Sequence, residues 1–393
     1  MNLNSKKNIV FVSISSDLYG SSKLLLTLVF QLKKRDTNYN PIVCLPFEDG
    51  PLKQKLIKEG IEIIEMPVLK LTRAMLKTLS FGSFFKEYKE AKTILESKLN
   101  GREVLCIQSN TLATMFGAFY CFGNSTYHVL HVHEIMDRPW FVKYFFSFFQ
   151  LFFANKIIFN SKATETFYLN ILRFLKKKSV LIYNGIDRDS EFLNSNQREQ
   201  LRLELFQANK EEILIGLIGR FNRLKGHKLL IEAFKEVNFK HQNTKLCLIG
   251  SPPESQEHFL DDIKQIIKQE NLTSRIIILP FQEEIYRIID TLDIVTVPST
   301  EPESFGIIAV EAMLSKKVVI GSNIGGLSNV IKNMETGLLF DVNCRSALVH
   351  SINTVVEDQN LKLFLEENGN KTAKREFSVN SMVNRFIKVY NTI

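Results

Sequence analysis

The chain has 393 residues, of which 45% are hydrophobic and 23% are charged. That length accommodates two or three domains, each with its own core. The ordinary apolar content excludes a disordered or fibrous chain. Five cysteines are scattered without a C-x-x-C pair. We therefore expect neither a disulfide framework nor a zinc site, but a protein of a reducing, cytoplasmic compartment.

The net charge of +8 is unevenly distributed along the chain. Residues 1–200 contain 27 Lys and Arg against 18 Asp and Glu, a net +9, whereas residues 201–393 contain 23 against 24, a net −1. This asymmetry favours contact between the N-terminal half and an anionic surface; a solvated basic surface without a partner is the alternative. We expect peripheral contact with the inner face of a membrane and no binding of nucleic acid.

Short β-branched runs alternate with longer amphipathic segments along the whole chain. Strands are predicted at residues 9–14, 41–45, 61–65, 103–108, 127–131, 156–159 and 179–182 and, after a polar stretch at 194–210, at 213–218, 245–249, 275–279, 293–297, 317–320 and 337–340. Helical periodicity is found at 21–35, 71–98, 227–240 and 259–270. Apolar strands that alternate with helices predict parallel sheets covered on both faces. Two such series with one break predict two facing Rossmann-like domains.

Two segments of the first half are rich in phenylalanine. Residues 140–154 are too short to span a bilayer, which needs about 20 residues. Phe145, Phe148, Phe149 and Phe152 follow the i, i+3, i+4, i+7 spacing of a buried stripe, so we expect them in the core, with an interfacial helix as the alternative. Residues 69–92 place six Lys and Arg around three Phe, which favours membrane or acceptor contact.

The loop after the strand at 213–218 joins Gly219-Arg220 to Lys225-Gly226. An Arg fork and a Lys point charge five residues apart suit a diphosphate. Taken alone, these residues are more typical of surface cations beside the start of a helix.

A second motif changes that balance. After the strand at 293–297 the chain reads PSTEPESFGIIAVEAM, in which Glu303 and Glu311 flank the start of a helix at Phe305-Gly306. The free N–H groups of a helix start bind anions. A carboxylate about one and a half turns further along can accept hydrogen bonds from a ribose diol.

With these two motifs, the chain resembles the retaining GT-B glycosyltransferases of family 4 (glycosyl transferases group 1). Further marks are Asn184-Gly185-Ile186-Asp187, the pair Gly325-Gly326 and Thr336-Gly337. The resemblance covers essentially the whole chain. It implies an acceptor domain at 1–185, a donor domain at 186–376, and a terminal helix at 377–393 that crosses back onto the first domain.

The resemblance also implies roles for individual residues. Arg220 and Lys225 would bind the donor diphosphate, Glu311 the nucleotide ribose, and Glu303 would lie near the transferred sugar. The amides of Phe305, Gly306 and Ile307 would cradle phosphate and sugar. Gly20 stands where the family usually has a Gly-Gly pair opposite the diphosphate.

The family places a His before an acidic residue beside the donor sugar. His133 of the sequence His131-Val132-His133-Glu134 is the better match, and His131 is the reserve. We expect the two side chains to point to opposite sides of an extended segment, so that one of them serves the site.

Asp187-Arg188-Asp189 has the form of a metal-binding Asp-x-Asp, but it lies at the domain junction and is predicted to be a turn. No metal and no cofactor other than the nucleotide-sugar co-substrate is expected. The predicted function is transfer of a sugar from a UDP- or GDP-sugar to a lipid-linked or cell-surface glycan. The alternatives are a sugar-nucleotide epimerase or phosphorylase of the same fold, or a non-catalytic membrane-associated scaffold.

Overall fold

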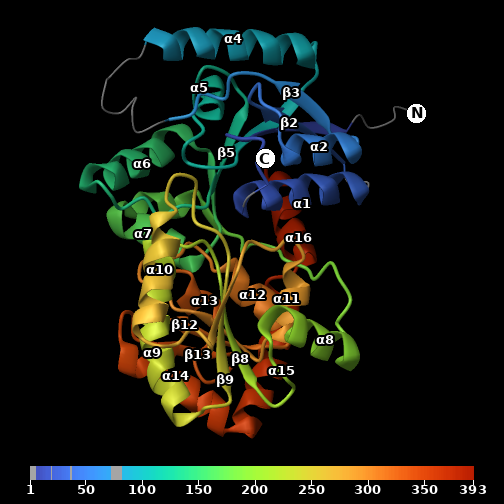
Figure 1. Cartoon of the computed structure of the whole chain (residues 1–393). Helices are drawn as coiled ribbons and strands as arrows, with labels where there is room; N and C mark the ends of the chain where they lie inside the picture. The colour runs from blue at the N-terminus through green and yellow to red at the C-terminus, as the bar shows by residue number, and fades with distance from the viewer. Residues whose placement is uncertain (1–5, 19, 36–37, 72–81) are drawn as a thin grey trace. The chain divides into compact units, whose positions relative to one another are not determined.

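The computed structural model describes residues 6–18, 20–35, 38–71 and 82–393 (Figure 1). The chain divides into two compact units: unit 1 contains Met1–Gly185 and Val379–Ile393, and unit 2 contains Ile186–Ser378. Each unit is a parallel α/β structure, which confirms the predicted fold class. Phe377 belongs to unit 2, where its ring packs 5.6 Å from that of Phe305. The final crossing therefore lies two residues later than expected.

Unit 1 contains a seven-stranded sheet in the order β3-β2-β1-β4-β5-β6-β7. Its strands are β1 (Lys7–Val12), β2 (Tyr39–Leu45), β3 (Glu62–Glu65), β4 (Val104–Ser109), β5 (Tyr127–Val132), β6 (Lys156–Phe159) and β7 (Ser179–Leu181). Its helices are α1 (Gly20–Lys34), α2 (Pro51–Lys58), α4 (Gly82–Leu99), α5 (Phe116–Phe122), α6 (Trp140–Phe153), α7 (Lys162–Ile171), the short η1 (Arg173–Lys177) and α16 (Val379–Tyr390).

Alternate residues of the strands in unit 1 enter two separate cores. On β1, Val10 and Val12 face one core, whereas Ile9 and Phe11 face the other. This is the two-residue period of a strand that is buried on both faces. The second core also contains α16, which lies beside α1 (Figure 1). The last helix of the chain is thus part of the first unit's core.

Unit 2 repeats the plan with a six-stranded sheet in the order β10-β9-β8-β11-β12-β13. Its strands are β8 (Ile213–Ile218), β9 (Thr244–Ile249), β10 (Ile276–Leu279), β11 (Ile294–Val297), β12 (Val318–Ser322) and β13 (Leu338–Phe340). Its helices are α8 (Ser195–Phe206), η2 (Arg223–Lys225), α9 (His227–Lys240), α10 (His258–Gln269), α11 (Ile285–Thr291), α12 (Ile307–Leu314), α13 (Leu327–Val330), α14 (Arg345–Glu357) and α15 (Gln359–Glu376).

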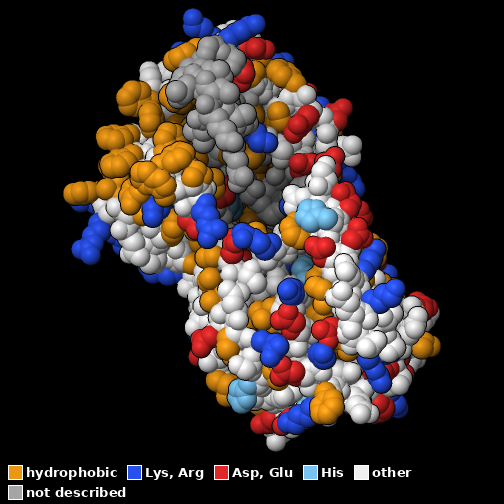
Figure 2. Space-filling model, turned by 60° about the vertical axis from the view of Figure 1, so that its left-hand side comes forward, with side chains coloured by type: hydrophobic (Ala, Val, Ile, Leu, Met, Phe, Trp, Pro, Cys, Tyr) orange, Lys and Arg blue, Asp and Glu red, His pale blue; other side chains and the backbone are white. Residues whose placement is uncertain are grey.

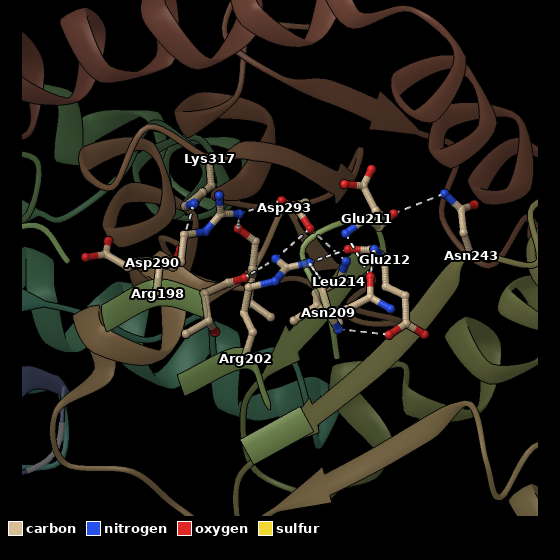
Figure 3. Close-up of polar contacts among 12 residues, drawn as sticks. Arg198, Arg202, Asn209, Glu211, Glu212, Leu214, Asn243, Asp290, Asp293 and Lys317 are labelled. Atoms are coloured by element: carbon tan, nitrogen blue, oxygen red, sulfur yellow. Dashed lines mark hydrogen bonds and ion pairs between the residues drawn. The ribbon is translucent and has the colours of Figure 1, made fainter. Parts of the chain in front are cut away.

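The polar stretch at 194–210 is largely a helix, α8. Asn194 and Gln197 form a capping box at its start. Arg198 and Arg202 both reach the carboxylate of Asp293, which also accepts the Leu214 N–H at 2.8 Å (Figure 3). Burial alone would raise the pKa of Asp293, but Arg202 and these hydrogen bonds hold it below its usual value. Asp293 precedes β11, so this network anchors α8 at the amino ends of the strands.

The expectation of a buried Phe stripe on α6 is wrong for three of its four residues. Phe149 is 5% exposed, but Phe145, Phe148 and Phe152 are 42%, 49% and 66% exposed. Both faces of α6 are aromatic, so spacing alone could not select the buried one. Of residues 69–92, the part at 72–81 lies outside the described residues. Among the described residues, no helix is both long and apolar enough to cross a membrane.

Candidate active site

The strand order of unit 2 identifies where its ligand site should lie. β8 and β11 are neighbours, while the strands that follow each of them, β9 and β12, lie on opposite sides. This arrangement is a topological switch point. The loops after the two adjacent strands leave the carboxyl ends in opposite directions, and a crevice opens between them. The two sequence motifs are the loops that follow β8 and β11. The topology therefore brings them together.

Direct contacts join these two loops. Lys225 Nζ lies 2.7 Å from Glu303 Oε1, and the Thr300 N–H donates to the Leu224 carbonyl at 2.9 Å. Gly226 has a φ of +72° and lies so close to the Pro298 carbonyl that a Cβ atom would overlap it. A glycine is therefore required where the two loops meet.

Neighbouring side chains hold the Lys225–Glu303 pair in place. Asn222 Oδ1 accepts the N–H groups of Leu224 and Lys225 at 3.0 and 3.2 Å and so caps η2. Glu303 Oε1 also accepts a hydrogen bond from the Ser299 hydroxyl. The Lys225 and Glu303 side chains are 27% and 17% exposed, so the pair is accessible to a small charged ligand.

The start of α12 is fixed by a close backbone approach. Gly306 is its N-cap, with a φ of +97°. The Gly326 N–H donates to the Glu303 carbonyl at 2.6 Å, and a Cβ atom at Gly326 would lie 2.5 Å from the Cα and N atoms of Phe305. Gly325, with a φ of +59°, approaches Glu303 as closely. The glycine pair thus holds the backbone of residues 303–306, whose amides precede the helix.

The other predicted residues of unit 2 lie on the same elements. Arg220 follows β8 and is exposed. Ile307 is the first residue of α12, and Glu311 is buried four residues further along the helix. The structure thus pairs Lys225 directly with Glu303 and places Arg220, Phe305, Gly306, Ile307 and Glu311 on the loops and helix that adjoin this pair.

The two predicted residues of unit 1 lie on different elements. Gly20 is the first residue of α1. His133 follows β5 and is 9% exposed, and His131 is the next-to-last residue of that strand. The expectation that the two rings diverge is wrong, because their centroids are 3.9 Å apart. In an extended segment residues two apart share a face, so both rings lie on the same side.

Burial controls the protonation of these histidines. It lowers the pKa of His133 to about 3 and that of His131 well below its usual value, the latter also through the charge of His133. Within the described part of the chain, His131 Nδ1 and Nε2 and His133 Nε2 are buried without a hydrogen-bond partner. Burial also raises the pKa of the neighbouring Glu134 to about 7, although its carboxylate accepts the His133 N–H at 3.1 Å. Both rings are therefore neutral at pH 7.

The supporting roles of three residues were not identified from the sequence. Ser299 and Asn222 position Glu303 and Lys225, and Glu134 binds the backbone of His133. For Asn222 a signal existed, because Asn followed by a short helical turn is typical of an N-cap. The contact between Ser299 and Glu303 had no comparable signal, since it depends on how the loop after β11 folds.

Comparisons with known proteins agree with this geometry. Residues 201–372 match the family model of Glycosyl transferases group 1. The capsular polysaccharide biosynthesis glycosyltransferase CapM of Staphylococcus aureus is 26% identical over 267 residues, 67% of this chain and 68% of CapM. N-acetyl-alpha-D-glucosaminyl L-malate synthase of Bacillus anthracis is 26% identical over 209 residues, 53% of this chain and 52% of the synthase. The chain thus matches only about half the length of the second relative.

The whole fold also matches solved structures. The crystal structure of Anabaena Alr3699/HepE in complex with UDP and glucose superposes with a TM-score of 0.82 and 23% identity, over 98% of this chain and 99% of that one. Two parallel α/β units of this kind define the GT-B class. The match to the group 1 model lies within unit 2, and the chain is an enzyme of the glycosyltransferase class with the GT-B fold.

Proposed function

We propose that the enzyme moves a sugar from a UDP- or GDP-sugar to a lipid-linked or cell-surface glycan, with retention of the anomeric configuration and without a metal. The observation that carries the donor class is Lys225 Nζ held 2.7 Å from Glu303 at the switch point, next to the start of α12. A cation and the N–H groups at the start of a helix, placed at one crevice, suit a diphosphate. The relative CapM acts in capsular polysaccharide biosynthesis, which supports a glycan acceptor.

In this mechanism the bond between the sugar C1 and the diphosphate oxygen breaks as the acceptor oxygen bonds to C1 on the same face. The leaving phosphate takes the proton of the acceptor hydroxyl. Lys225, Arg220 and the amides of residues 305–307 stabilise the negative charge that develops on the diphosphate. Donors preorganised in this way are each worth about 3–4 kcal/mol in the transition state when measured by removal.

The ion pair gives Lys225 and Glu303 separate tasks. An incoming diphosphate competes with the Glu303 carboxylate for the Lys225 ammonium, and the carboxylate then becomes available to the hydroxyls of the sugar. Glu311 is assigned to the ribose, because a buried carboxylate on α12 offers two acceptors to a diol. Unit 1 is assigned to the acceptor, and of its residues Gly20 is assigned to the donor diphosphate and His133 to the donor sugar.

Binding of UDP and GDP to the full chain tests the donor assignment. In calorimetric titrations we expect Lys225→Ala and Arg220→Ala each to weaken nucleoside diphosphate binding at least about tenfold, which is roughly 1.4 kcal/mol. In transfer assays we expect each variant to reduce turnover by at least the same factor. Arg223→Ala is the matched control, because Arg223 lies on the same η2 helix but pairs with Glu301. Unchanged binding and turnover in both Lys225 and Arg220 variants would contradict the diphosphate site.

Glu303→Gln separates binding from transfer. Because the substitution removes the carboxylate that competes for Lys225, we expect UDP binding to be retained or tightened while transfer falls at least about tenfold. Equal losses in binding and transfer would instead show that Glu303 only positions Lys225.

Activity that disappears in a chelator and returns with a divalent cation would contradict metal independence.

A further inference from the structure

The outer face of α6 is an exposed aromatic surface on unit 1. Val142, Phe146 and Phe149 are at most 5% exposed and pack inward. The opposite side of the helix carries six aromatic residues that are 42–72% exposed: Trp140, Phe141, Tyr144, Phe145, Phe148 and Phe152. Figure 2 shows hydrophobic side chains gathered on this side of the molecule. We call these six residues the aromatic face.

Neighbouring elements extend the aromatic face. Phe122 at the end of α5 is 73% exposed, and its ring lies 5.3 Å from that of Phe153 on α6. Phe174 on η1, which packs against α6, is 67% exposed. Contiguous exposed apolar surface of this kind is uncommon on a monomer and marks an interaction site.

The charge around the aromatic face is strongly positive. From residue 137 to residue 178 the chain has eight Lys and Arg and two acidic residues, Asp137 and Glu165, a net +6. Glu165 is buried and paired with Lys162 and Lys176. This one segment therefore supplies almost half of the net charge of unit 1, which is +13.

The cations of this segment lie close to the aromatic side chains. Lys143 is on α6 itself, with Nζ 5.2 Å from the centre of the Tyr144 ring. Arg173, Lys176 and Lys177 are exposed on η1. Lysine and arginine can lay their apolar stems along a hydrophobic surface while the charged ends reach lipid phosphates.

We infer that the aromatic face of α6 docks unit 1 on an anionic lipid bilayer. Aromatic residues on one side of a helix, with Lys and Arg at its edge, suit the boundary between headgroups and acyl chains. The surrounding segment carries a net charge of +6, which favours an anionic surface as the partner. With 14 residues α6 is about 21 Å long, so it lies in the interface and does not cross it.

Helix α6 is already held in place before it meets a bilayer. Lys178 Nζ donates to the carbonyls of Leu151 and Ala154 at 2.6 and 2.8 Å and so ties down the C-terminal end of α6. The inner face packs into the core of unit 1. Little ordering is then required when the helix meets lipid. The inference deepens the proposed function, since a lipid-linked acceptor is presented at such a surface, but its test measures lipid binding and not transfer.

The protein carries its own probe for the experiment. Trp140 is the single tryptophan of the chain and is 72% exposed on the aromatic face. We expect its fluorescence to shift to the blue when the full chain is mixed with vesicles of phosphatidylcholine and phosphatidylglycerol. Brominated acyl chains should quench it. Vesicles of phosphatidylcholine alone should bind at least about tenfold more weakly, and added salt should weaken binding to the anionic vesicles.

Variants identify the surface. Phe148→Ser with Phe152→Ser should reduce sedimentation with anionic vesicles at least about tenfold, because each aromatic ring loses its burial in the bilayer. Phe239→Ser is the matched control, since Phe239 is 88% exposed on α9 of unit 2, and it should bind as the unmodified chain does. An unchanged melting curve shows that the double variant is folded.

Three results would overturn the inference. One is no binding of the unmodified chain to anionic vesicles, and another is equal binding by the double variant. The third is a dimer in solution that the double variant abolishes, which would assign the aromatic face to a second copy of the chain. A failure of the donor assignment would instead appear as absent nucleotide binding, with vesicle binding intact.

Discussion

The two units share one sheet plan but differ in charge and in the environment of their candidate residues. In unit 1 the strands run 3-2-1-4 from one edge, and the first four strands of unit 2 follow the same order. Unit 1 holds 27 Lys and Arg against 14 Asp and Glu, a net +13, whereas unit 2 holds 23 against 28, a net −5. The positive charge lies in unit 1 and not in unit 2, the unit to which we assign the donor. A shared sheet fixes where loops emerge, but the loops alone decide what binds there.

At the candidate site the contrast is equally clear. Unit 2 places an accessible ion pair between the loops after β8 and β11. Unit 1 places two buried histidines, neutral at pH 7, at the end of β5. Charge is thus concentrated where a diphosphate is expected, and neutral rings are found in the unit assigned to the acceptor. The following experiments test this difference, from the largest expected effect to the smallest.

Removal of residues 379–393 should unfold unit 1 and leave unit 2 folded. Val383, Phe386 and Tyr390 of α16 are at most 1% exposed in the core of unit 1. Loss of a buried Phe costs about 3–5 kcal/mol, and removal of several such residues exceeds the stability of a typical domain. We expect unit 1 to unfold, as read by loss of amide hydrogen-exchange protection in its strands, while unit 2 still binds UDP by calorimetry. Native protection in unit 1 and an unchanged melting temperature would show that α16 is dispensable.

Acid should destabilise unit 1 before unit 2. Burial lowers the pKa of His128 to about 4 and of His133 to about 3, and lowers that of His131 further. Below the unfolded value of about 6.5 the unfolded state binds more protons, so stability falls as the pH falls, by up to about 1.4 kcal/mol per pH unit for each histidine. Glu134 opposes this between pH 7 and 4.5, because its folded pKa is raised. In unit 2, burial and the charge of Lys225 lower the pKa of His227 to about 4. This one histidine destabilises unit 2 in acid, whereas three histidines destabilise unit 1.

The net effect for unit 1 is a loss of roughly 3 kcal/mol per pH unit below pH 6.5 as an upper value. Urea unfolding of unit 1 between pH 7 and 5, followed by amide hydrogen exchange of its strands, measures it. We expect Glu134→Gln to steepen the loss, because the opposing carboxyl is removed, and His133→Gln to reduce it. A stability that is independent of pH in this range would contradict the buried, neutral state of the histidines.

Gly326→Ala should test the backbone approach that holds the start of α12. Gly326 has an ordinary φ of −66°, so any effect arises from the 2.5 Å contacts of the new Cβ atom with Phe305 and Ser304. We expect a loss of about 1–3 kcal/mol in the unfolding free energy of unit 2, together with weaker UDP binding. Gly123→Ala is the control in unit 1, since its nearest neighbour is 4.0 Å away, and it should be close to neutral.

Tyr390→Phe should have the smallest effect. The Tyr390 hydroxyl donates to Gln108 Oε1 at 2.7 Å inside unit 1. Loss of this one hydrogen bond costs about 0.5–1.5 kcal/mol. Urea unfolding of unit 1 measures the loss, and the exposed Tyr144→Phe should change nothing. Equal effects of the two substitutions would show that the hydrogen bond does not join α16 to the sheet.

The sequence predicted the fold well because strands buried on both faces have continuous apolar runs. All thirteen predicted strands are present, and β6 and β8 have the expected bounds. The failures occurred where the periodic signal was ambiguous. Both faces of α6 are aromatic, so its exposed side could not be chosen, and the polar stretch at 194–210 forms α8 because Arg198 and Arg202 reach Asp293. Both outcomes depend on tertiary contacts.

For the candidate site, the sequence identified residues better than it identified their relations. Lys225 and Glu303 were both selected, but their ion pair and the Ser299 contact arise from loop geometry. Gly325 and Gly326 were noted as a motif, and only the structure shows that their lack of side chains lets the backbone of residues 303–306 approach. The histidine error had a simpler cause, since alternation along a strand places residues two apart on one face.

The position of α16 has a consequence for synthesis. Unit 2 is a continuous stretch, Ile186–Ser378, whereas unit 1 needs its first 185 residues and its last 15. The first unit to begin emerging from the ribosome is therefore the last that can complete its core. At roughly 5–20 residues per second, the final helix follows the end of β7 by about 10–40 s. During that interval the surface that α16 covers on β1 and α1 is open, and nascent unit 1 is a natural client for a chaperone.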